Sequence, residues 1–101
     1  MRVAKLPQAL TDLVETAYYI AEDDPDAADR FFDAFEASLE TIRRTPKIGS
    51  IRKFQNRDEI RMWFVRGFEK CLIFYTEDTN EIVILRIIHS ARDYHRVFGD
   101  E

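Results

Sequence analysis

The sequence contains little cysteine, glycine or proline, and it has no long run of apolar residues. Its 101 residues include one cysteine, three glycines and three prolines. Cys71 has no second cysteine to pair with, which suits a reducing cytoplasm. Because it lies within an aromatic segment, we predict that its thiol is buried and unreactive. The longest apolar stretch, IVIL followed by Arg86 and II, is far too short to cross a membrane. The N-terminus lacks the basic, apolar and small-residue pattern of a secretory signal, so we expect a cytoplasmic protein.

The chain is acidic overall, with a formal net charge of −4, which argues against general nucleic-acid binding. The charges are unevenly distributed along it. Residues 1–50 carry six basic and ten acidic groups, whereas residues 43–70 carry nine basic and three acidic groups. A hydrophobic content of 46% and an aromatic content of 13% are sufficient for a core. We therefore expect residues 1–101 to form one folded domain, acidic overall but with a basic band.

Two segments of the first half have apolar residues at helical spacing. RVAKL at residues 2–6 alternates and predicts a short strand before them. The expected helices span residues 7–22 and 25–45, because Asp24 can cap the second helix and Pro25 can start it. So short a connection predicts an antiparallel hairpin. The apolar stripes are Leu10, Leu13, Val14, Ala17 and Ala21 in the first helix, and Ala28, Phe31, Phe32, Phe35, Leu39 and Ile42 in the second.

The second half changes to the pattern of strands. The segments SIRKF, EIRMWFVR, KCLIFYT and EIVILRII are rich in β-branched and aromatic residues, and short polar connectors separate them. Successive strands should pair as antiparallel hairpins. Alternation places two groups of side chains on opposite faces of the sheet: Leu72 and Phe74, and Cys71, Ile73 and Tyr75. These patterns predict an α+β fold, in which an N-terminal strand and the helical hairpin pack on a small, mainly antiparallel sheet.

Two arginines interrupt apolar faces of the predicted strands, and two interpretations are open for them. Arg61 shares its expected face with Trp63 and Val65, and Arg86 shares its face with Ile82, Ile84 and Ile88. Both can lie on an open sheet face and pair with carboxylates or stack on rings. Alternatively they line a concave anion site, since guanidinium binds phosphate or carboxylate through two hydrogen bonds. The basic surface would then extend to Lys47, Arg52 and Lys53.

The segment RIIHSARDYHRVF, residues 86–98, is the densest group of chemically active side chains. His89 shares the expected parity of Val83, Leu85 and Ile87 and is expected as a core residue with a satisfied ring nitrogen. Asp93 is expected as a helix cap or an arginine partner. Tyr94 can pack, stack on a base or transfer a proton. Two histidines six residues apart, with one distant cysteine, are a weak metal signal, so we expect no metal and no cofactor. From about Ala91 the chain is expected to form a short helix or to be irregular.

Five fragments, in order, resemble the pattern of the RelE/ParE superfamily of bacterial toxins: YYIAEDDPDAADRFFDAF, TPKIGSIR, IRMWFV, LIFYTE and IVILRIIHSARD. The resemblance covers nearly the whole chain and is closest to the ParE branch. It implies a helical hairpin against a small antiparallel sheet. It also implies a toxin of a type II toxin–antitoxin system, neutralised in a hetero-oligomer by a co-expressed, ParD-like antitoxin whose flexible part folds over it. ParE members are associated with blocking DNA gyrase, whereas RelE members cut messenger RNA on the ribosome.

The resemblance therefore implies two candidate activities. Family ribonucleases depend on basic residues across the sheet and on an acid, histidine or tyrosine near the last strand; the comparable positions here are Arg61, Arg86, His89 and Tyr94. A ribosome-dependent nuclease needs a strongly basic face to compete for RNA, whereas this chain is acidic. HSARD also looks like a ParE-type ending. We therefore predict a toxin that inhibits gyrase by binding, with messenger RNA cleavage as the alternative and an inactive antitoxin-binding member as a third possibility.

We also predict where an antitoxin binds. Tyr19 falls opposite the predicted stripe of the first helix and Tyr18 flanks it, so both offer exposed apolar contacts. A partly disordered partner can place an amphipathic helix in the groove between hairpin and sheet, and can add an extended segment along the sheet. Arg52, Lys53 and Arg61 offer charge for an acidic tail. The predicted antitoxin site therefore combines these two tyrosines with these three basic residues.

Overall fold

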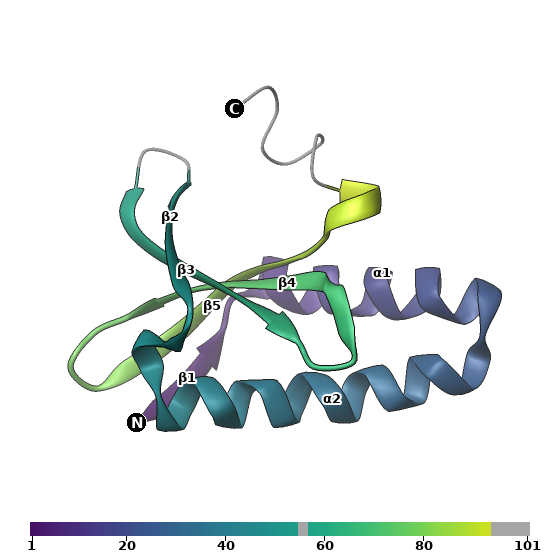
Figure 1. Ribbon diagram of the computed structural model, residues 1–101, viewed down its shortest axis with the longest axis horizontal. Coiled ribbons are helices and arrows are strands. Elements are labelled where there is room, and N and C mark those ends of the chain that lie inside the picture. Colours follow the sequence, from purple (N-terminus) through teal and green to yellow (C-terminus); the bar gives the residue numbers. More distant parts are fainter. Residues whose placement is uncertain (55–56, 94–101) are drawn as a thin grey trace.

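A computed structural model of the chain describes residues 1–54 and 57–93. Five strands form one sheet, and the α1–α2 hairpin packs on one of its faces (Figure 1). The sheet order is β1-β5-β4-β3-β2, in which β1 runs parallel to β5 and the other neighbours are antiparallel. This confirms the predicted α+β fold. The elements are β1 (Arg2–Lys5), α1 (Pro7–Asp23), α2 (Pro25–Arg44), the 3₁₀ helix η1 (Pro46–Ile48), β2 (Ser50–Phe54), β3 (Arg57–Val65), β4 (Phe68–Glu77) and β5 (Glu81–His89).

Local signals fix the turn between the helices and the turn between β3 and β4. Asp24 Oδ1 accepts a hydrogen bond from the Ala27 N–H at 3.1 Å, and Pro25 occupies the first turn of α2. Gly67 has a φ of 84°, in the left-handed region that glycine adopts without strain, and so allows the tight turn after β3. In the described part of the chain, no helix is long and apolar enough to span a membrane.

The core has two parts, one on each face of the sheet. The helix-facing part contains Phe31, Phe35, Leu39 and Ile42 of α2, together with Cys71, Ile73 and Tyr75 of β4. The part on the opposite face contains Ile60, Phe74, Leu85 and Ile88, with Leu72 packed against it. The predicted alternation of side chains along β4 is therefore confirmed.

Strand β5 contains a bulge that its sequence pattern does not reveal. Ile84 pairs with Tyr75 whereas Arg86 pairs with Phe74, so Leu85 is an extra residue in the ladder. The extra residue reverses the alternation that follows it. The predicted faces of β5 are therefore wrong beyond the bulge: Ile82, Ile84 and Ile87 belong to the helix-facing core, and Leu85 and Ile88 to the opposite one.

Asp12 connects α1 to β5 next to this bulge. Its buried carboxylate accepts hydrogen bonds from Arg86 Nε at 2.7 Å, from Arg86 Nη2 at 3.1 Å and from the backbone N–H of Ile87 at 3.0 Å. Gln8 Nε2 donates a fourth at 3.1 Å. A buried carboxylate needs such partners because losing its hydration is costly. Arg86 thus pairs with a carboxylate, as one interpretation predicted, and its side chain is 20% exposed.

Bringing Asp12 to the sheet sets the rotation of α1, and this corrects the predicted stripe of the first helix. The side chains buried beside Asp12 are small or polar as well as apolar: Ala9, Leu13, Thr16 and Ala17. Leu10 and Val14, predicted to be in the core, are 47% and 49% exposed. Phe32 of α2 is likewise 39% exposed. Leu10, Val14 and Phe32, all predicted to be buried, are therefore on the surface of the hairpin.

The hydroxyl of Tyr75 holds η1 and the start of β2 against the sheet. It donates a hydrogen bond to the Pro46 carbonyl at 2.7 Å and accepts one from the Gly49 N–H at 3.0 Å. A Cβ at residue 49 would lie 2.6 Å from this hydroxyl, so the close approach requires glycine. The contact fixes the position of Lys47, which follows Pro46 directly.

We predict that Asp12→Ala destabilises the protein by about 3–5 kcal/mol, because it leaves the largely buried Arg86 guanidinium without its carboxylate and the Ile87 N–H unpaired. Glu36→Ala is the matched control. Glu36 also joins a helix to a strand, 3.4 Å from Lys5 Nζ, but it is exposed. Its loss should cost less than about 1 kcal/mol. Urea unfolding of both variants measures the difference, and equal losses would show that Asp12 does not have this role.

Candidate functional site

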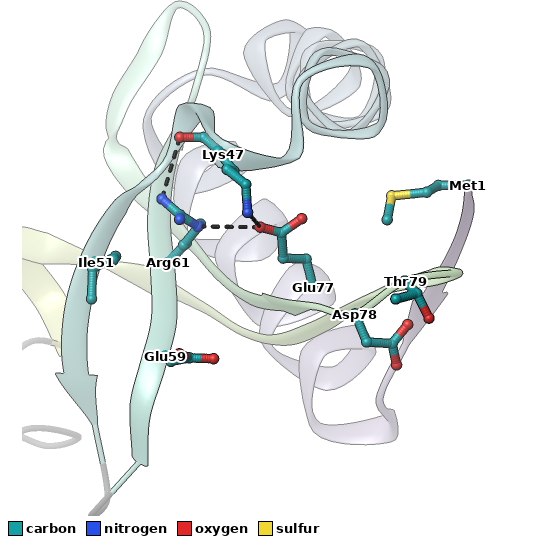
Figure 2. A pocket seen from close by; sticks show the side chains of 8 residues that line it. All are labelled: Met1, Lys47, Ile51, Glu59, Arg61, Glu77, Asp78 and Thr79. Carbon is teal, nitrogen blue, oxygen red and sulfur yellow. Dashed lines mark hydrogen bonds and ion pairs between the residues drawn. The ribbon is translucent and has the colours of Figure 1, made fainter.

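A cavity of about 460 Å³ lies between η1 and the turn that joins β4 to β5 (Figure 2). Arg61 donates hydrogen bonds to the Gly49 carbonyl at 2.7 Å and the Lys47 carbonyl at 3.3 Å. Glu77 Oε1 lies between two cations, 3.0 Å from Lys47 Nζ and 3.7 Å from Arg61 Nε (Figure 2). The lining residues are Met1, Lys47, Ile51, Glu59, Arg61, Glu77, Asp78 and Thr79.

The charges of this cavity do not favour an anionic ligand. Its lining contains three carboxylates, Glu59, Glu77 and Asp78, and only two cations. The Arg61 guanidinium is already bonded to two backbone carbonyls. Arg86 does not line the cavity, because it is bonded to Asp12 on α1. The predicted anion site that combines Arg61 and Arg86 is therefore not formed.

The end of β5 is held against α1 by a cluster of four side chains: Tyr19, His89, Arg92 and Asp93. Residues 90–93 form a helical turn, and the buried Asp93 carboxylate accepts hydrogen bonds from the His89 N–H at 3.1 Å and from Arg92 Nε at 2.6 Å. Arg92 also donates to the Glu15 carbonyl at 3.1 Å. Its guanidinium carbon lies 5.2 Å from the centre of the Tyr19 ring, which contacts the His89 ring edge-on at 4.9 Å. Asp93 is therefore an arginine partner, as predicted.

Burial makes two potential catalytic groups less reactive near neutral pH: His89 at the end of β5, and Cys71, which pairs with it on β4. His89 is 8% exposed, and its burial, followed by the nearby Arg92 charge, lowers its pKa below the ordinary value. Its Nδ1 has no hydrogen-bond partner among the described residues. Burial likewise raises the pKa of the Cys71 thiol to about 12, so little of it is thiolate near neutral pH. Cys71 is buried, as predicted, and Tyr94 lies outside the described residues.

An apolar groove lies on the α1–α2 hairpin, with a volume of about 270 Å³. We call it the hairpin groove, and its lining residues are Val14, Ala17, Tyr18, Ala21, Ala28 and Phe32. Tyr18 is 72% exposed, which agrees with the prediction of a free tyrosine on α1. Val14 and Phe32 were missed as surface residues because their spacing matches that of the buried stripes. On α1, the four-residue interval between Leu10, Val14 and Tyr18 was a signal that these three side chains lie on one face of the helix.

The residues predicted to bind an antitoxin lie in two separate places. Arg52 and Lys53 are exposed on the edge strand β2, and Arg61 is on the neighbouring β3. The part of α1 that carries Tyr18 and Tyr19 is near the helix turn, far from β2 along the molecule (Figure 1). Tyr18 faces the hairpin groove, whereas Tyr19 is 38% exposed and contacts His89 and Arg92. A single partner would have to extend along the molecule to reach both places.

We predict that His89 makes the protein less stable as the pH falls below about 6.5. The pKa of His89 is lowered in the folded state, so the unfolded chain takes up the proton first as the pH falls. The contribution of neutral His89 to stability is therefore present above about pH 6.5 and is lost below it. His89→Phe should reduce the loss between about pH 6.5 and pH 5, by at most about 1.4 kcal/mol per pH unit. Urea unfolding across this range tests it, with His95 present in both proteins. Parallel stability curves would contradict the prediction.

Comparisons with known proteins agree with these features. A family model described as the ParE toxin of the type II toxin–antitoxin system parDE matches residues 3–94. A solved structure from P. aeruginosa, described as a chromosomal ParDE toxin–antitoxin system, has the same fold. Its TM-score is 0.70 at 18% sequence identity, over 88% of this chain and 95% of that chain. No curated protein sequence matches the chain. Since the family match covers nearly all of the sequence, the chain belongs to the ParE toxin family of type II toxin–antitoxin systems.

Proposed function

We propose that this ParE-family toxin inhibits DNA gyrase by binding to it, and that a ParD-like antitoxin neutralises it in a hetero-oligomer. One observation supports binding over catalysis: the candidate catalytic side chains that the structure describes are bonded or buried within the protein itself. Arg86 is bonded to Asp12, and Arg61 to two backbone carbonyls. His89 is buried, with a lowered pKa. A nuclease would need such groups to be free to contact a phosphate and to exchange a proton.

The large apolar side chains on the hairpin support a protein partner. Leu10, Val14, Tyr18 and Phe32 are all exposed, and contiguous exposed apolar residues commonly mark a protein interface. Membership in a type II toxin–antitoxin family implies an antitoxin partner. The acidic net charge of −4 also fits a protein-binding toxin better than one that competes for RNA. Both proposed partners would be met in the cytoplasm, where we place the toxin.

We predict that the purified toxin inhibits gyrase-catalysed supercoiling and leaves messenger RNA intact in a translating extract. A sample mixed beforehand with excess antitoxin is the control, and it should restore supercoiling. Transcript cleavage without an effect on gyrase would contradict the proposal and favour the RelE-type activity. No effect in either assay would also contradict it and favour an inactive, antitoxin-binding member.

We predict that the double substitution Tyr18→Ala and Arg52→Ala weakens antitoxin binding at least about tenfold, equivalent to about 1.4 kcal/mol. These residues represent the two predicted contact regions, and both are exposed. Tyr19 and Arg61 are less suitable for this test because both make contacts within the fold. Arg66→Ala, at an exposed position at the end of β3, is the control and should leave affinity unchanged. Isothermal titration calorimetry measures all three, and unchanged affinity in the double variant would place the interface elsewhere.

A further inference from the structure

Cys71 and His89, which are far apart in sequence, lie directly opposite each other on β4 and β5. Opposite residues of antiparallel strands have Cβ atoms about 4.5–5.5 Å apart, and their side chains point to the same face of the sheet. Both residues also line a cavity of about 370 Å³, whose other lining residues are Ile20, Gly67, Phe68, Glu69 and Lys70. A thiol and an imidazole therefore meet in one cavity.

The imidazole of His89 has an unpaired nitrogen at this cavity. His89 is 8% exposed, and its Nδ1 has no hydrogen-bond partner among the described residues, which include Cys71. The ring nitrogen expected to be satisfied is therefore not satisfied at Nδ1. Leaving a buried polar atom unpaired costs free energy, and most such atoms in proteins have a partner. Nδ1 is thus an atom whose pairing a bound ligand would complete.

The two side chains are ligands for a soft metal ion that accepts low coordination. Thiolate and imidazole both suit copper. Structural zinc sites are almost always four-coordinate, and the described part of the chain contains no group of three or more histidine, cysteine, aspartate or glutamate side chains that could hold a metal. Cu(I), by contrast, forms stable complexes with two ligands. The pair therefore fits Cu(I) better than Zn²⁺.

The charges around the pair also favour a monovalent ion. A thiolate at Cys71 and Cu(I) are neutral together, whereas a divalent ion would leave a positive charge in the cavity. The Arg92 charge lies close enough to both residues to affect their pKa values, and the Lys70 charge affects the pKa of His89. Asp93 also acts on both residues, but it is already paired with Arg92. An additional buried positive charge would therefore be costly here.

We propose that Cys71 and His89 form a site for the soft monovalent ion Cu(I), which joins β4 to β5 through Cys71 Sγ and His89 Nδ1. On binding, the S–H bond is lost, a Cu–S bond forms and the proton passes to solvent, with no change of oxidation state. Burial disfavours a free thiolate at Cys71, but the Cu(I)–thiolate pair is neutral and avoids this cost. The property is independent of the proposed inhibition of gyrase.

Anaerobic titration of the intact protein with Cu(I) alone, in competition with a coloured Cu(I) chelator, tests the site. We expect one ion bound per chain and one proton released, with binding weakened at least about tenfold in Cys71→Ala and in His89→Phe. Met62→Leu is the control and should leave the affinity unchanged, because it removes a sulfur that packs on the opposite face of the sheet. Urea unfolding without metal verifies that each variant is folded.

The wild-type protein also provides a test that needs no substitution. Cu(I) should produce the ultraviolet absorption of a sulfur–copper bond, and it should raise the melting temperature, whereas Zn²⁺ should not. Absence of the absorption, or unchanged affinity in a folded Cys71→Ala or His89→Phe variant, would overturn the proposal. Equal weakening in Met62→Leu would overturn it as well. Stabilisation by Zn²⁺ that depends on both residues would identify a divalent site and contradict the assignment of the ion.

Discussion

The contact between Asp12 and Arg86 is the constraint on which the rest of the structure depends. It joins the first helix to the last strand across 74 positions of sequence and, through the Ile87 N–H, satisfies the backbone just after the bulge in β5. The carboxylate can reach these donors only if α1 turns its small and polar face toward the sheet. An interior ion pair of this kind is a weak source of net stability, but it strongly disfavours any other rotation of the helix, because a buried charge would then lose its partner.

The same contact connects the fold to the proposed function. With Asp12 directed inward, Leu10 and Val14 point outward and, together with Tyr18 and Phe32, form the exposed apolar surface of the hairpin. Arg86, the most prominent candidate for phosphate binding on the last strand, is at the same time occupied by a carboxylate. One interaction therefore both removes a candidate catalytic group and creates a candidate binding surface. At the end of the strand, Arg92 and Asp93 fix the chain against α1 in a similar way.

The local sequence was sufficient to predict where the helices and strands lie, but not which side of α1 and of β5 faces the core. Asp24 followed by Pro25 placed the start of the second helix at the correct residue, and alternation placed the two faces of β4 correctly. The bulge at Leu85 could not be predicted, because IVILRII is uniformly compatible with a strand and the bulge depends on pairing with β4. The outward position of Val14 also could not be predicted, since hydrophobicity alone favours its burial over that of Asp12. The candidate site was foreseen in part: Tyr18 is exposed, whereas the grouping of Arg61 with Arg86 is not observed.

A double-mutant cycle between Asp12 and Arg86 tests the central claim, which is that the arginine of the last strand serves the fold. The free energies of unfolding of Asp12→Ala, Arg86→Ala and the double variant give the coupling energy directly. We expect a coupling of about 2 kcal/mol or more, with each single variant about as unstable as the double variant. A coupling near zero would contradict the account, above all if Arg86→Ala folds as stably as the wild type while the toxin loses its activity.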